Sequence, residues 1–296
     1  MSVVLVTGCS SGFGELIART LATHRHRVYA SMRGLGQRNA LAAQRLTEWA
    51  ASAGVPLSVV ELDVTNDTSV RAAVDRIQAT DGDIDVVVNN AGSSSRGPLE
   101  AFSIPQMAAL LDVNVLGPMR VNKAVLPAMR ERRGGLIIWV SSTLGRVLVG
   151  GGLYPATKWA VEGFAESLHN QVAPFGIEVV ILEPGSFPTP STSNAMRAED
   201  QAITDAYAAV GPPPRNRRAP TDGSYQPPNP QEVADAVLDI MQTPVGQRPL
   251  RRVVGPQHTD GVPAYNETYE RLRAHMAEVL KRPDHAVTWG PPPDSR

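Results

Sequence analysis

The stretch VVLVTGCSSGFG, residues Val3–Gly14, sets a four-residue apolar run directly before a glycine-rich turn. The apolar run predicts a strand buried on both faces, and Leu16–Thr23 beyond the turn has the pattern of a helix. Glycine permits positive φ and close approach of the backbone to a ligand, and a helix N-terminus offers free N–H groups to a pyrophosphate. This strand-turn-helix unit predicts phosphate binding, although its spacing is Gly-x-x-x-Gly-x-Gly and not the Gly-x-Gly-x-x-Gly of the usual dinucleotide fingerprint.

Short apolar runs and segments of helix length alternate as far as Gly185. The further runs rich in Val, Ile and Leu are Val28–Ala30, Leu57–Leu62, Ile84–Val88, Leu136–Val140 and Ile177–Leu182. The predicted helices between them are Leu35–Ala53, Ser69–Ala79, Gln106–Arg130 and Tyr154–Pro174. This order predicts an α/β fold, a doubly wound parallel sheet of the Rossmann type in three layers, α/β/α. Right-handed crossovers place the carboxyl ends of the strands at one edge of the sheet, where ligands bind.

The alternation stops after Gly185. Residues 186–230 are rich in Pro, Ser, Thr and Arg, with one predicted helix around Ala195–Ala209. Because this segment follows a strand end at the expected active edge, we interpret it as a long lid insertion over the substrate. A disordered insertion is the alternative.

Regular structure is predicted to resume at Asn229. Asn as N-cap, Pro at the first helical position and Glu232 three residues after the cap form a capping-box start. The elements that follow are a helix to about Gln242, a last strand at Leu250–Val254 and a helix near Ala264–Lys281. Two arginines in the last strand suit a sheet edge. Residues 282–296 are interpreted as a tail, so that 1–296 forms a single domain.

The composition argues against several classes of protein. A net charge of −1 gives no indication of nucleic acid or an anionic membrane surface as partner. No apolar run approaches the roughly 18 residues of a membrane span, and the N-terminal run is too short for a signal peptide. The single cysteine, Cys9, cannot form an internal disulfide, which indicates a reducing compartment and predicts a cytoplasmic protein. The six histidines include no H-x-x-x-H pair, so no metal site is expected.

Tyr154 and Lys158, in the sequence YPATK, lie four residues apart and share one face of a helix. A nearby positive charge stabilises phenolate and lowers the pKa of a tyrosine toward the working pH. The pair therefore predicts a general acid/base at Tyr154, although tyrosine and lysine meet at this spacing by chance on many helices.

The end of the second predicted strand bears on the choice of cofactor. A carboxylate at this place binds the adenosine ribose of NAD. This chain reads VYASMR, without an acid and with Arg33 at the end. Because a guanidinium matches a 2′-phosphate, we expect NADP(H) to be preferred, with NAD(H) possible. The alternative is an Arg33 that merely points to solvent.

Further motifs follow in chain order. Together with the turn Thr7–Gly14 they are Leu62-Asp63-Val64, Asn89-Asn90-Ala91-Gly92, Asn114, Ser141-Ser142, Tyr154-x-x-x-Lys158 and Pro184-Gly185-x-x-x-Thr189. Each motif is loose, but their joint occurrence resembles the short-chain dehydrogenase/reductase family, one-domain type, from Val3 to about Thr189. The stretches TGCSSGFG, VYASMR and LDVNV are most similar to the hydroxysteroid and retinol dehydrogenase branch.

The resemblance implies roles for individual residues. The implied catalytic residues are Asn114, Ser142, Tyr154 and Lys158. Ser142 would hold the substrate oxygen, Lys158 would also bind the nicotinamide ribose, and Asn114 would anchor a water in a proton relay. With the turn and Arg33, the residues expected to bind the cofactor are Gly8, Ser10, Ser11, Gly12, Phe13, Gly14, Arg33, Asp63, Val64, Asn90, Ala91, Gly92, Tyr154, Lys158, Pro184, Gly185, Phe187 and Thr189.

The serine departs from the family's pattern. The family's serine commonly lies 13 residues before the tyrosine, whereas Ser142 lies 12 before Tyr154 and Ser141 lies 13 before it. We choose Ser142 because Gly145, three residues downstream, aligns with it, and we assign the missing residue to the Val147–Leu153 loop. Ser141 is the alternative.

The sequence thus predicts an oxidoreductase that transfers a hydride between NADP(H) and a bulky hydrophobic alcohol/carbonyl pair, such as a steroid, a retinoid or an aromatic ketone. The alternative is a non-catalytic NADP(H)-binding sensor or regulatory protein on the same fold. The resemblance also implies a homodimer or homotetramer that associates through the predicted helices Gln106–Arg130 and Tyr154–Pro174.

Overall fold

The computed structural model describes residues 1–148, 151–210, 227–256, 259 and 261–281. Its centre is a seven-stranded sheet in which all neighbouring strands are parallel, in the order β3-β2-β1-β4-β6-β7-β9. These strands are β1 (Val3–Val6), β2 (Arg27–Met32), β3 (Leu57–Glu61), β4 (Val86–Asn89), β6 (Gly135–Val140), β7 (Ile177–Pro184) and β9 (Arg251–Val254). The chain reverses direction across the sheet between β1 and β4, which opens a crevice at their carboxyl ends. The predicted doubly wound sheet is confirmed.

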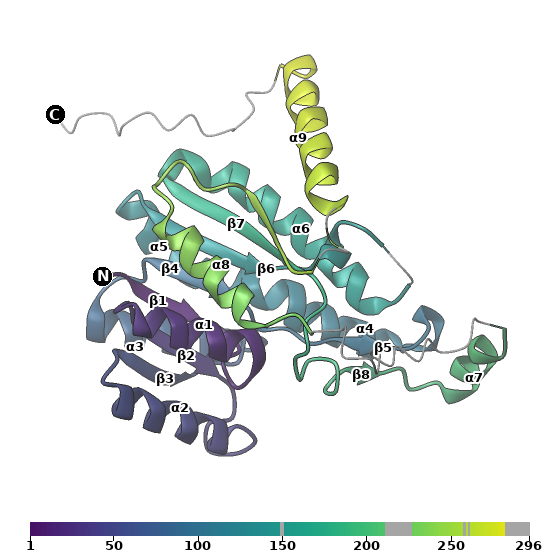
Figure 1. Cartoon of the computed structure of the whole chain (residues 1–296), viewed down its shortest axis with the longest axis horizontal. Coiled ribbons are helices and arrows are strands. Elements are labelled where there is room, and N and C mark those ends of the chain that lie inside the picture. Colours follow the sequence, from purple (N-terminus) through teal and green to yellow (C-terminus); the bar gives the residue numbers. More distant parts are fainter. Residues whose placement is uncertain (149–150, 211–226, 257–258, 260, 282–296) are drawn as a thin grey trace.

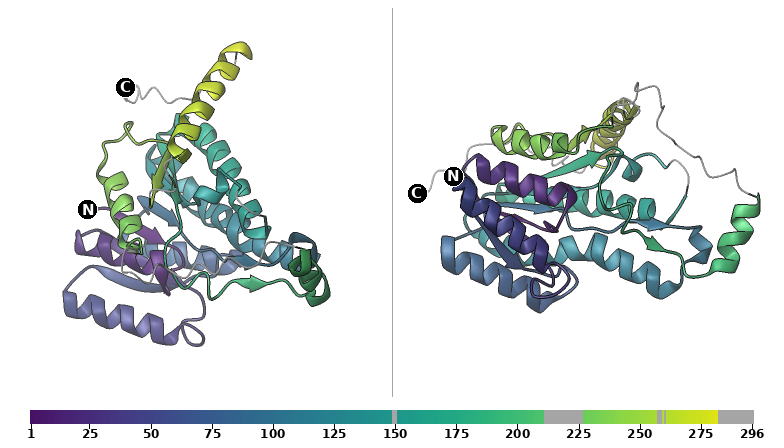
Figure 2. Two further views of the ribbon diagram at one scale, coloured as in Figure 1. Left: turned by 45° about the vertical axis from the view of Figure 1, so that its right-hand side comes forward. Right: turned by 60° about the horizontal axis from the view of Figure 1, so that its bottom comes forward.

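Helices cover both faces of the sheet (Figures 1 and 2). One face is covered by α1 (Gly12–Thr23), α2 (Ala40–Ala53) and α8 (Gln231–Gln242), and the other by α3 (Asp67–Asp81), α5 (Gly117–Glu131) and α6 (Leu153–Val172). Successive strand residues point to opposite faces, so that Val4 and Val6 enter the first of these cores and Leu5 enters the second. Burial on both faces explains why the strands read as continuous apolar runs.

Most helices differ from their predicted bounds, and two of the differences have a clear structural description. The helix predicted from Leu35 begins at Ala40, because the Glu61 carboxylate accepts the N–H groups of Gly34 and Leu35 and holds them in a turn. The helix predicted over Gln106–Arg130 is three consecutive segments: α4 (Ile104–Leu111), a π-helical turn (Asp112–Leu116) and α5. Periodicity alone does not reveal a π turn, which shifts the helix face by a single residue.

The segment after β7 also differs from prediction. Met196–Arg197 form a short strand, β8, that pairs with β5 (Ser95–Arg96), so the predicted helix at Ala195–Ala209 begins only at Gln201. That helix, α7 (Gln201–Val210), has no buried residue. Residues 211–226 of the predicted lid lie outside the described residues.

The structure places the N-cap of α8 at Pro230, one residue after the predicted Asn229, and Pro230 has no side-chain capping hydrogen bond, but Asn229 and Glu232 still make contacts at the helix start. The Asn229 side chain accepts the N–H of Gln231, and the Glu232 carboxylate accepts the N–H of Asn229, at 3.0 and 3.2 Å. Beyond β9, α9 (Gly261–Val279) replaces the predicted helix Ala264–Lys281 and extends away from the body of the molecule (Figure 1). The predicted tail 282–296 lies outside the described residues.

Three short 3-10 turns complete the described elements: η1 (Leu99–Ala101), η3 (Thr143–Gly145) and η4 (Ala173–Phe175). The second of these, η3, follows soon after the end of β6, and Ser142 is its N-cap residue at the carboxyl edge of the sheet. In the part of the chain that the structure describes, no helix is long and apolar enough to cross a membrane.

Candidate active site

A cleft of about 860 Å³ lies at the carboxyl edge of the sheet. The predicted site residues that line it are Gly8, Ser10, Ser11, Gly12, Phe13, Arg33, Asp63, Val64, Asn90, Ala91, Gly92, Tyr154, Lys158 and Thr189. The predicted residues that do not line it are Gly14, Asn114, Ser142, Pro184, Gly185 and Phe187. The structure thus brings residues from both halves of the sheet to one cleft, as the topology requires.

The glycines of the turn between β1 and α1 leave no room for side chains. A Cβ at Gly8 would lie 2.8 Å from the Cα of Ala91, and φ at Gly8 is +75°. A Cβ at Gly14 would lie 2.3 Å from the carbonyl oxygen of Gly8 and 2.5 Å from Nδ2 of Asn90. Gly12 has φ of +61°, a conformation that favours glycine.

Polar contacts fasten this turn to the end of β4. Oγ1 of Thr7 accepts the N–H groups of Asn90 and Ala91, both at 3.0 Å. Nδ2 of Asn90 donates to the carbonyl oxygens of Thr7 and Gly8, at 2.8 and 3.2 Å. The turn and the Asn-Asn-Ala-Gly motif therefore form one rigid corner of the cleft.

This corner fits a dinucleotide. The N-terminus of α1 lies at the turn, and the side chain of its N-cap residue, Ser11, makes no capping hydrogen bond. The first N–H groups of α1 therefore have no side-chain cap and carry the partial positive charge of a helix start. Because Gly8, Gly12 and Phe13 line the cleft beside them, the turn can accept a pyrophosphate.

Two basic residues lie at the adenosine end of the cleft. Nη1 of Arg33 is 3.6 Å from Oδ2 of Asp63, and both residues line the cleft. Burial would raise the pKa of Asp63, but hydrogen bonds from Thr65 and the Arg33 guanidinium lower it below its ordinary value. Arg38 also lines the cleft and was not predicted from the sequence. Arg33 therefore faces the cleft rather than only solvent.

Tyr154 lies in the first turn of α6. Its N–H donates to Oγ of Ser95 at 2.8 Å, a contact that fixes the start of the helix against β5. The ring is partly exposed in the cleft, while burial raises the pKa of the phenol above its ordinary value. A hydrogen bond with Ser142 acts in the opposite direction.

The two candidate serines face different ways. Ser142 hydrogen-bonds Tyr154, and its Oγ also accepts the N–H of Leu144 at 3.2 Å. Ser141, unlike Ser142, lines the cleft, yet its hydroxyl faces Glu162 and favours the ionised form of that carboxylate. The geometry therefore favours Ser142 over Ser141. The loop to which we assigned the missing residue, Val147–Leu153, includes residues 149 and 150, which lie outside the described residues.

Lys158 lies one helical turn after Tyr154, as predicted, but its charge does not govern the tyrosine as expected. Its Nζ donates to the carbonyl oxygen of Val140 at 2.8 Å and lies 5.7 Å from the centre of the Tyr154 ring. Burial lowers the pKa of Lys158 to about 8, an effect that the charge of Glu162 opposes. In this geometry burial outweighs charge at Tyr154, so the predicted lowering of its pKa by Lys158 was wrong.

Asn114 lies in the π-helical turn and is buried behind the cleft. Its Oδ1 accepts the N–H of Ser93 at 2.8 Å, and its Nδ2 donates to the carbonyl of Ser93 and to Oγ1 of Thr157, both at 2.9 Å. The side chain thus links the strand end after β4 to α6. Because it is fully engaged, a role for Asn114 in binding a water would fall to its main chain.

The loop after β7 packs on the cofactor turn. Phe187 is buried and meets Phe13 edge-on, with ring centroids 5.6 Å apart. Gly185 donates its N–H to the carbonyl oxygen of Val254 at 2.8 Å, which ties the loop to β9. This packing holds Thr189 where it lines the cleft.

Two contributors to the site carried no signal in the sequence. The Ser95 hydroxyl accepts the main-chain N–H of Tyr154 and so helps to position that residue, and Arg38 lines the cleft together with Arg33. Among the described residues no group of His, Cys, Asp and Glu side chains could hold a metal ion.

Fold and cleft together define a Rossmann-type protein of the dehydrogenase class. A family model described as short chain dehydrogenase matches residues 2–200. Retinol dehydrogenase 8 of Bos taurus is 36% identical over 270 residues, which cover 86% of this chain and 82% of that protein. Estradiol 17-beta-dehydrogenase 1 of Rattus norvegicus is 35% identical, over 82% of this chain and 71% of that protein.

Solved structures agree with these relatives. A short-chain dehydrogenase from Streptomyces avermitilis has a TM-score of 0.73 and 34% identity, covering 95% of this chain and 96% of that chain. An alcohol dehydrogenase from Thermococcus sibiricus, complexed with 5-hydroxy-NADP, has a TM-score of 0.67 and 27% identity, covering 86% of this chain and 96% of that chain. The chain belongs to the short-chain dehydrogenase family, in the branch of the retinol and hydroxysteroid dehydrogenases.

Proposed function

We propose that the protein is an oxidoreductase that transfers a hydride between NADP(H) and a bulky hydrophobic alcohol/carbonyl pair. The observation that carries this proposal is that Tyr154 and Lys158 both line the cleft, with the phenol hydrogen-bonded to Ser142, which does not itself line it, and the lysine buried one turn away. A protein that only binds a dinucleotide has no need of this group.

The proton chemistry follows from the setting of Tyr154. Burial keeps the phenol protonated, which suits a proton donor in the reductive direction. The Tyr154 hydroxyl would give its proton to the carbonyl oxygen as negative charge develops there. Ser142 would donate a hydrogen bond to the same oxygen, and Lys158, which lines the cleft, would bind the nicotinamide ribose. Bound NADPH supplies the hydride that the carbonyl carbon receives.

The preference for NADP(H) rests on the adenosine end of the cleft. Arg33 and Arg38 offer two guanidinium groups there, and β2 ends without a carboxylate. The relative from Thermococcus sibiricus, complexed with 5-hydroxy-NADP, supports the same choice. NAD(H) is the weaker alternative. The remaining cofactor contacts are proposed for the residues of the turn, the corner at Asn90–Gly92 and the loop to Thr189.

The hydrophobic substrate class rests on two observations. The relatives retinol dehydrogenase 8 and estradiol 17-beta-dehydrogenase 1 are named for a retinoid and a steroid. The cleft beyond Tyr154 is lined partly by the apolar side chains of Leu110, Val113 and Met196. Met196 belongs to the described part of 186–230, which supports the interpretation of that segment as a substrate lid.

Assembly and location are further parts of the proposal. We infer a homodimer or homotetramer that uses the helices α4, α5 and α6, where Trp159 and Phe164 on α6 and Leu116 in the π-helical turn between α4 and α5 are between 42% and 45% exposed. Light scattering on the purified protein measures this directly. A cytoplasmic location, with a reduced Cys9, stays a prediction.

Turnover with a panel of carbonyl compounds tests the proposal. The purified protein is given NADPH, and in parallel NADH, with retinal, a keto-steroid and small aromatic ketones. We expect oxidation of NADPH with at least one bulky member of the panel. Binding of NADPH without reduction of any compound would instead favour a sensor or regulatory protein, and turnover with NADH alone would contradict the role given to Arg33.

A further inference from the structure

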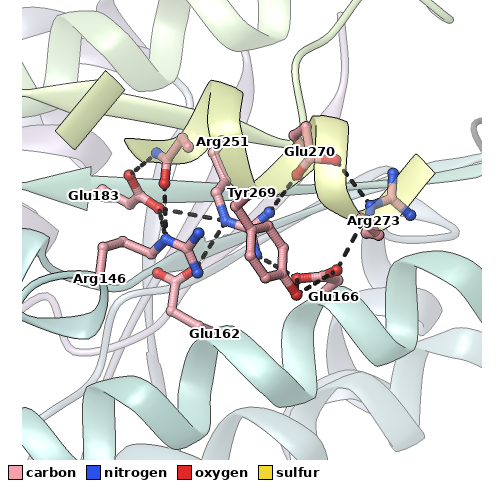
Figure 3. A network of polar contacts seen from close by, with 9 residues as sticks. Arg146, Glu162, Glu166, Glu183, Arg251, Tyr269, Glu270 and Arg273 are labelled. Atoms are coloured by element: carbon pink, nitrogen blue, oxygen red, sulfur yellow. Dashed lines mark hydrogen bonds and ion pairs between the residues drawn. The ribbon is translucent and has the colours of Figure 1, made fainter. Parts of the chain in front are cut away.

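A buried network of ion pairs lies behind the active site, between α6, β7, β9 and α9 (Figure 3). Arg251 is its centre, only 4% exposed at its side chain. Its guanidinium lies 3.1 Å from Glu162, 2.5 Å from Glu166, 3.5 Å from Glu183 and 2.7 Å from Glu270. β9 is an edge strand of the sheet, as its two arginines predicted, yet the Arg251 side chain is buried.

The charges in this network do not balance. Its carboxylates are Glu162, Glu166, Glu183 and Glu270, and its guanidinium groups are Arg146, Arg251 and Arg273. Four acids face three bases, so one negative charge is left over when all are ionised. Buried charge is costly unless it is paired, so this excess favours a cation close by.

Glu162 is the member of the network nearest in the chain to the proposed catalytic lysine. It follows Lys158 by four residues on α6, so both side chains lie on the same, buried face of the helix. Its Oε2 is held by Nε of Arg251, whereas Oε1 is buried without a hydrogen-bond partner among the described residues. Arg251 thus anchors one oxygen of Glu162, and the Ser141 hydroxyl faces the same carboxylate.

We propose that Glu162 is a positioning residue of the reaction: held under α6 by Arg251, it supplies the negative charge that keeps buried Lys158 protonated. The importance of Glu162 for catalysis rests on the proposed function. The effect of the Glu162 charge on the protonation of Lys158 does not. Lys158 would then stay cationic at neutral pH in a place where burial alone would discharge it.

The charged surroundings of both residues agree with this role. Burial lowers the pKa of Lys158, and Glu162 is the charge that raises it again. Burial raises the pKa values of Glu162 and of Glu183, the latter to about 7, and the charges of Arg251 and Arg146 oppose the rise at both carboxylates and so favour an ionised Glu162. The titratable and charged groups that face Glu162 or its partners are Lys158, Glu166 and His169 on α6, Arg146 after η3, Glu183 on β7, Arg251 on β9, and Tyr265, Tyr269, Glu270 and Arg273 on α9.

Direct titration of Lys158 tests the proposal without any substrate. The chain contains only three lysines, Lys123, Lys158 and Lys281, so lysine labelled with ¹³C at Cε gives three resonances to follow against pH. We expect Glu162→Gln to lower the pKa of Lys158 by about 1 unit relative to the wild type, as for loss of a close opposite charge.

Glu166→Gln is the matched control. It removes the same charge from the same helix, one turn further from Lys158, and it also breaks a contact with Arg251. If the role of Glu162 is merely structural, both variants should destabilise the protein and neither should change the pKa of Lys158. An unchanged pKa in Glu162→Gln, or equal shifts in the two variants, would overturn the proposal.

Two further measurements complete the test. Should Glu162→Gln not fold, Glu162→Asp keeps the charge and should leave the pKa of Lys158 within about 0.5 unit, whereas a fall of about 1 unit would contradict the account. If the enzyme is active, the alkaline limb of the plot of kcat against pH should shift in Glu162→Gln by the same amount as the pKa of Lys158. The KM for NADPH should change little. A wild type that titrates as expected but turns over no substrate would count against the proposed function alone.

Discussion

At the scale of single residues, Tyr154 is governed by burial more than by charge. Its pKa is raised, and the group that opposes the rise is Ser142, not Lys158. Lys158 instead donates to the carbonyl of Val140. A neutral phenol beside a hydroxyl that can share the substrate oxygen is a proton donor, which is why the reductive direction suits this geometry.

Arg33→Ala tests how the adenosine end selects its cofactor. A charge-assisted hydrogen bond contributes about 1.5–3 kcal/mol, and Arg33 is partly exposed, so KM for NADPH should rise roughly 10- to 100-fold. KM for NADH should change little because it has no 2′-phosphate. Steady-state kinetics with both cofactors measure this, with Arg71→Ala, exposed on α3, as the control. An equal rise in both KM values would contradict a 2′-phosphate contact.

Much of the candidate site could be predicted from residue types at fixed spacings in the sequence. Tyr154 and Lys158 could be paired from their separation alone, and Arg33 could be placed from the end of a strand. Ser95 and Arg38 could not, because their contacts depend on where loops fold back in space. The balance of burial and charge at Tyr154 was equally hidden, since desolvation depends on the packed structure and not on sequence spacing.

At the scale of elements, the corner formed by the first turn and the end of β4 shapes the cleft. Hydrogen bonds of Thr7 and Asn90 join two strands whose sequences lie 83 positions apart. The glycines let these backbones approach within contact distance. The corner therefore depends on main-chain geometry that a single methyl group would disturb.

Gly14→Ala should distort this corner. Its Cβ would lie 2.3 Å from the Gly8 carbonyl oxygen, so the backbone must shift, and we expect NADPH affinity to fall at least about 10-fold with a lower Tm. The matched control is Gly163→Ala, a helical glycine of α6 with no atom within 4 Å of its Cβ. That variant should be neutral or more stable by up to about 1 kcal/mol. Unchanged NADPH binding in Gly14→Ala, measured by calorimetry, would be the contrary result.

Element types were predicted better than their bounds. The strands buried on both faces stand out as runs of Val, Ile and Leu, and the sheet order follows from their alternation with helices. The π turn at Asn114, the late start of α2 and the pairing of Met196–Arg197 with Ser95–Arg96 were not visible. Each depends on a contact with a distant segment, which local pattern does not report.

At the scale of the whole molecule, the C-terminal helix α9 is joined to the catalytic helix through buried charge. Asn266 donates to Glu183 at 2.7 Å and accepts from Arg146 at 2.8 Å, while Glu270 binds Arg251. Residues from the middle of the chain and from its C-terminal part thus meet behind the active site (Figure 3). This arrangement couples the stability of α9 to the protonation of buried acids.

Arg251→Met should destabilise the protein by about 3–5 kcal/mol at pH 8, because it leaves buried carboxylates without their cation. Burial already raises the pKa of Glu183 to about 7, and loss of Arg251 raises it further. A carboxyl group whose pKa is higher in the folded than in the unfolded protein favours folding while it is protonated. This contribution to the stability of the protein is lost as the pH rises through the folded-state pKa. The deficit should therefore be smaller at pH 5.5 than at pH 8.

Urea unfolding at the two pH values measures this difference. Arg252→Met is the control, since Arg252 is the exposed neighbour on the same strand and should change stability little. A deficit in Arg251→Met that is the same at pH 5.5 and pH 8 would show that the network does not depend on ionised acids.

The most direct test of the central claim is the turnover of Tyr154→Phe compared with the wild type. The change removes one hydroxyl and keeps the ring, so the fold and NADPH affinity should be retained. We expect kcat/KM for the best carbonyl substrate to fall by about 100- to 10,000-fold, the range ascribed to a positioned general acid. Near wild-type turnover in Tyr154→Phe, with NADPH bound normally, would contradict the assignment of Tyr154 and with it the proposed mechanism.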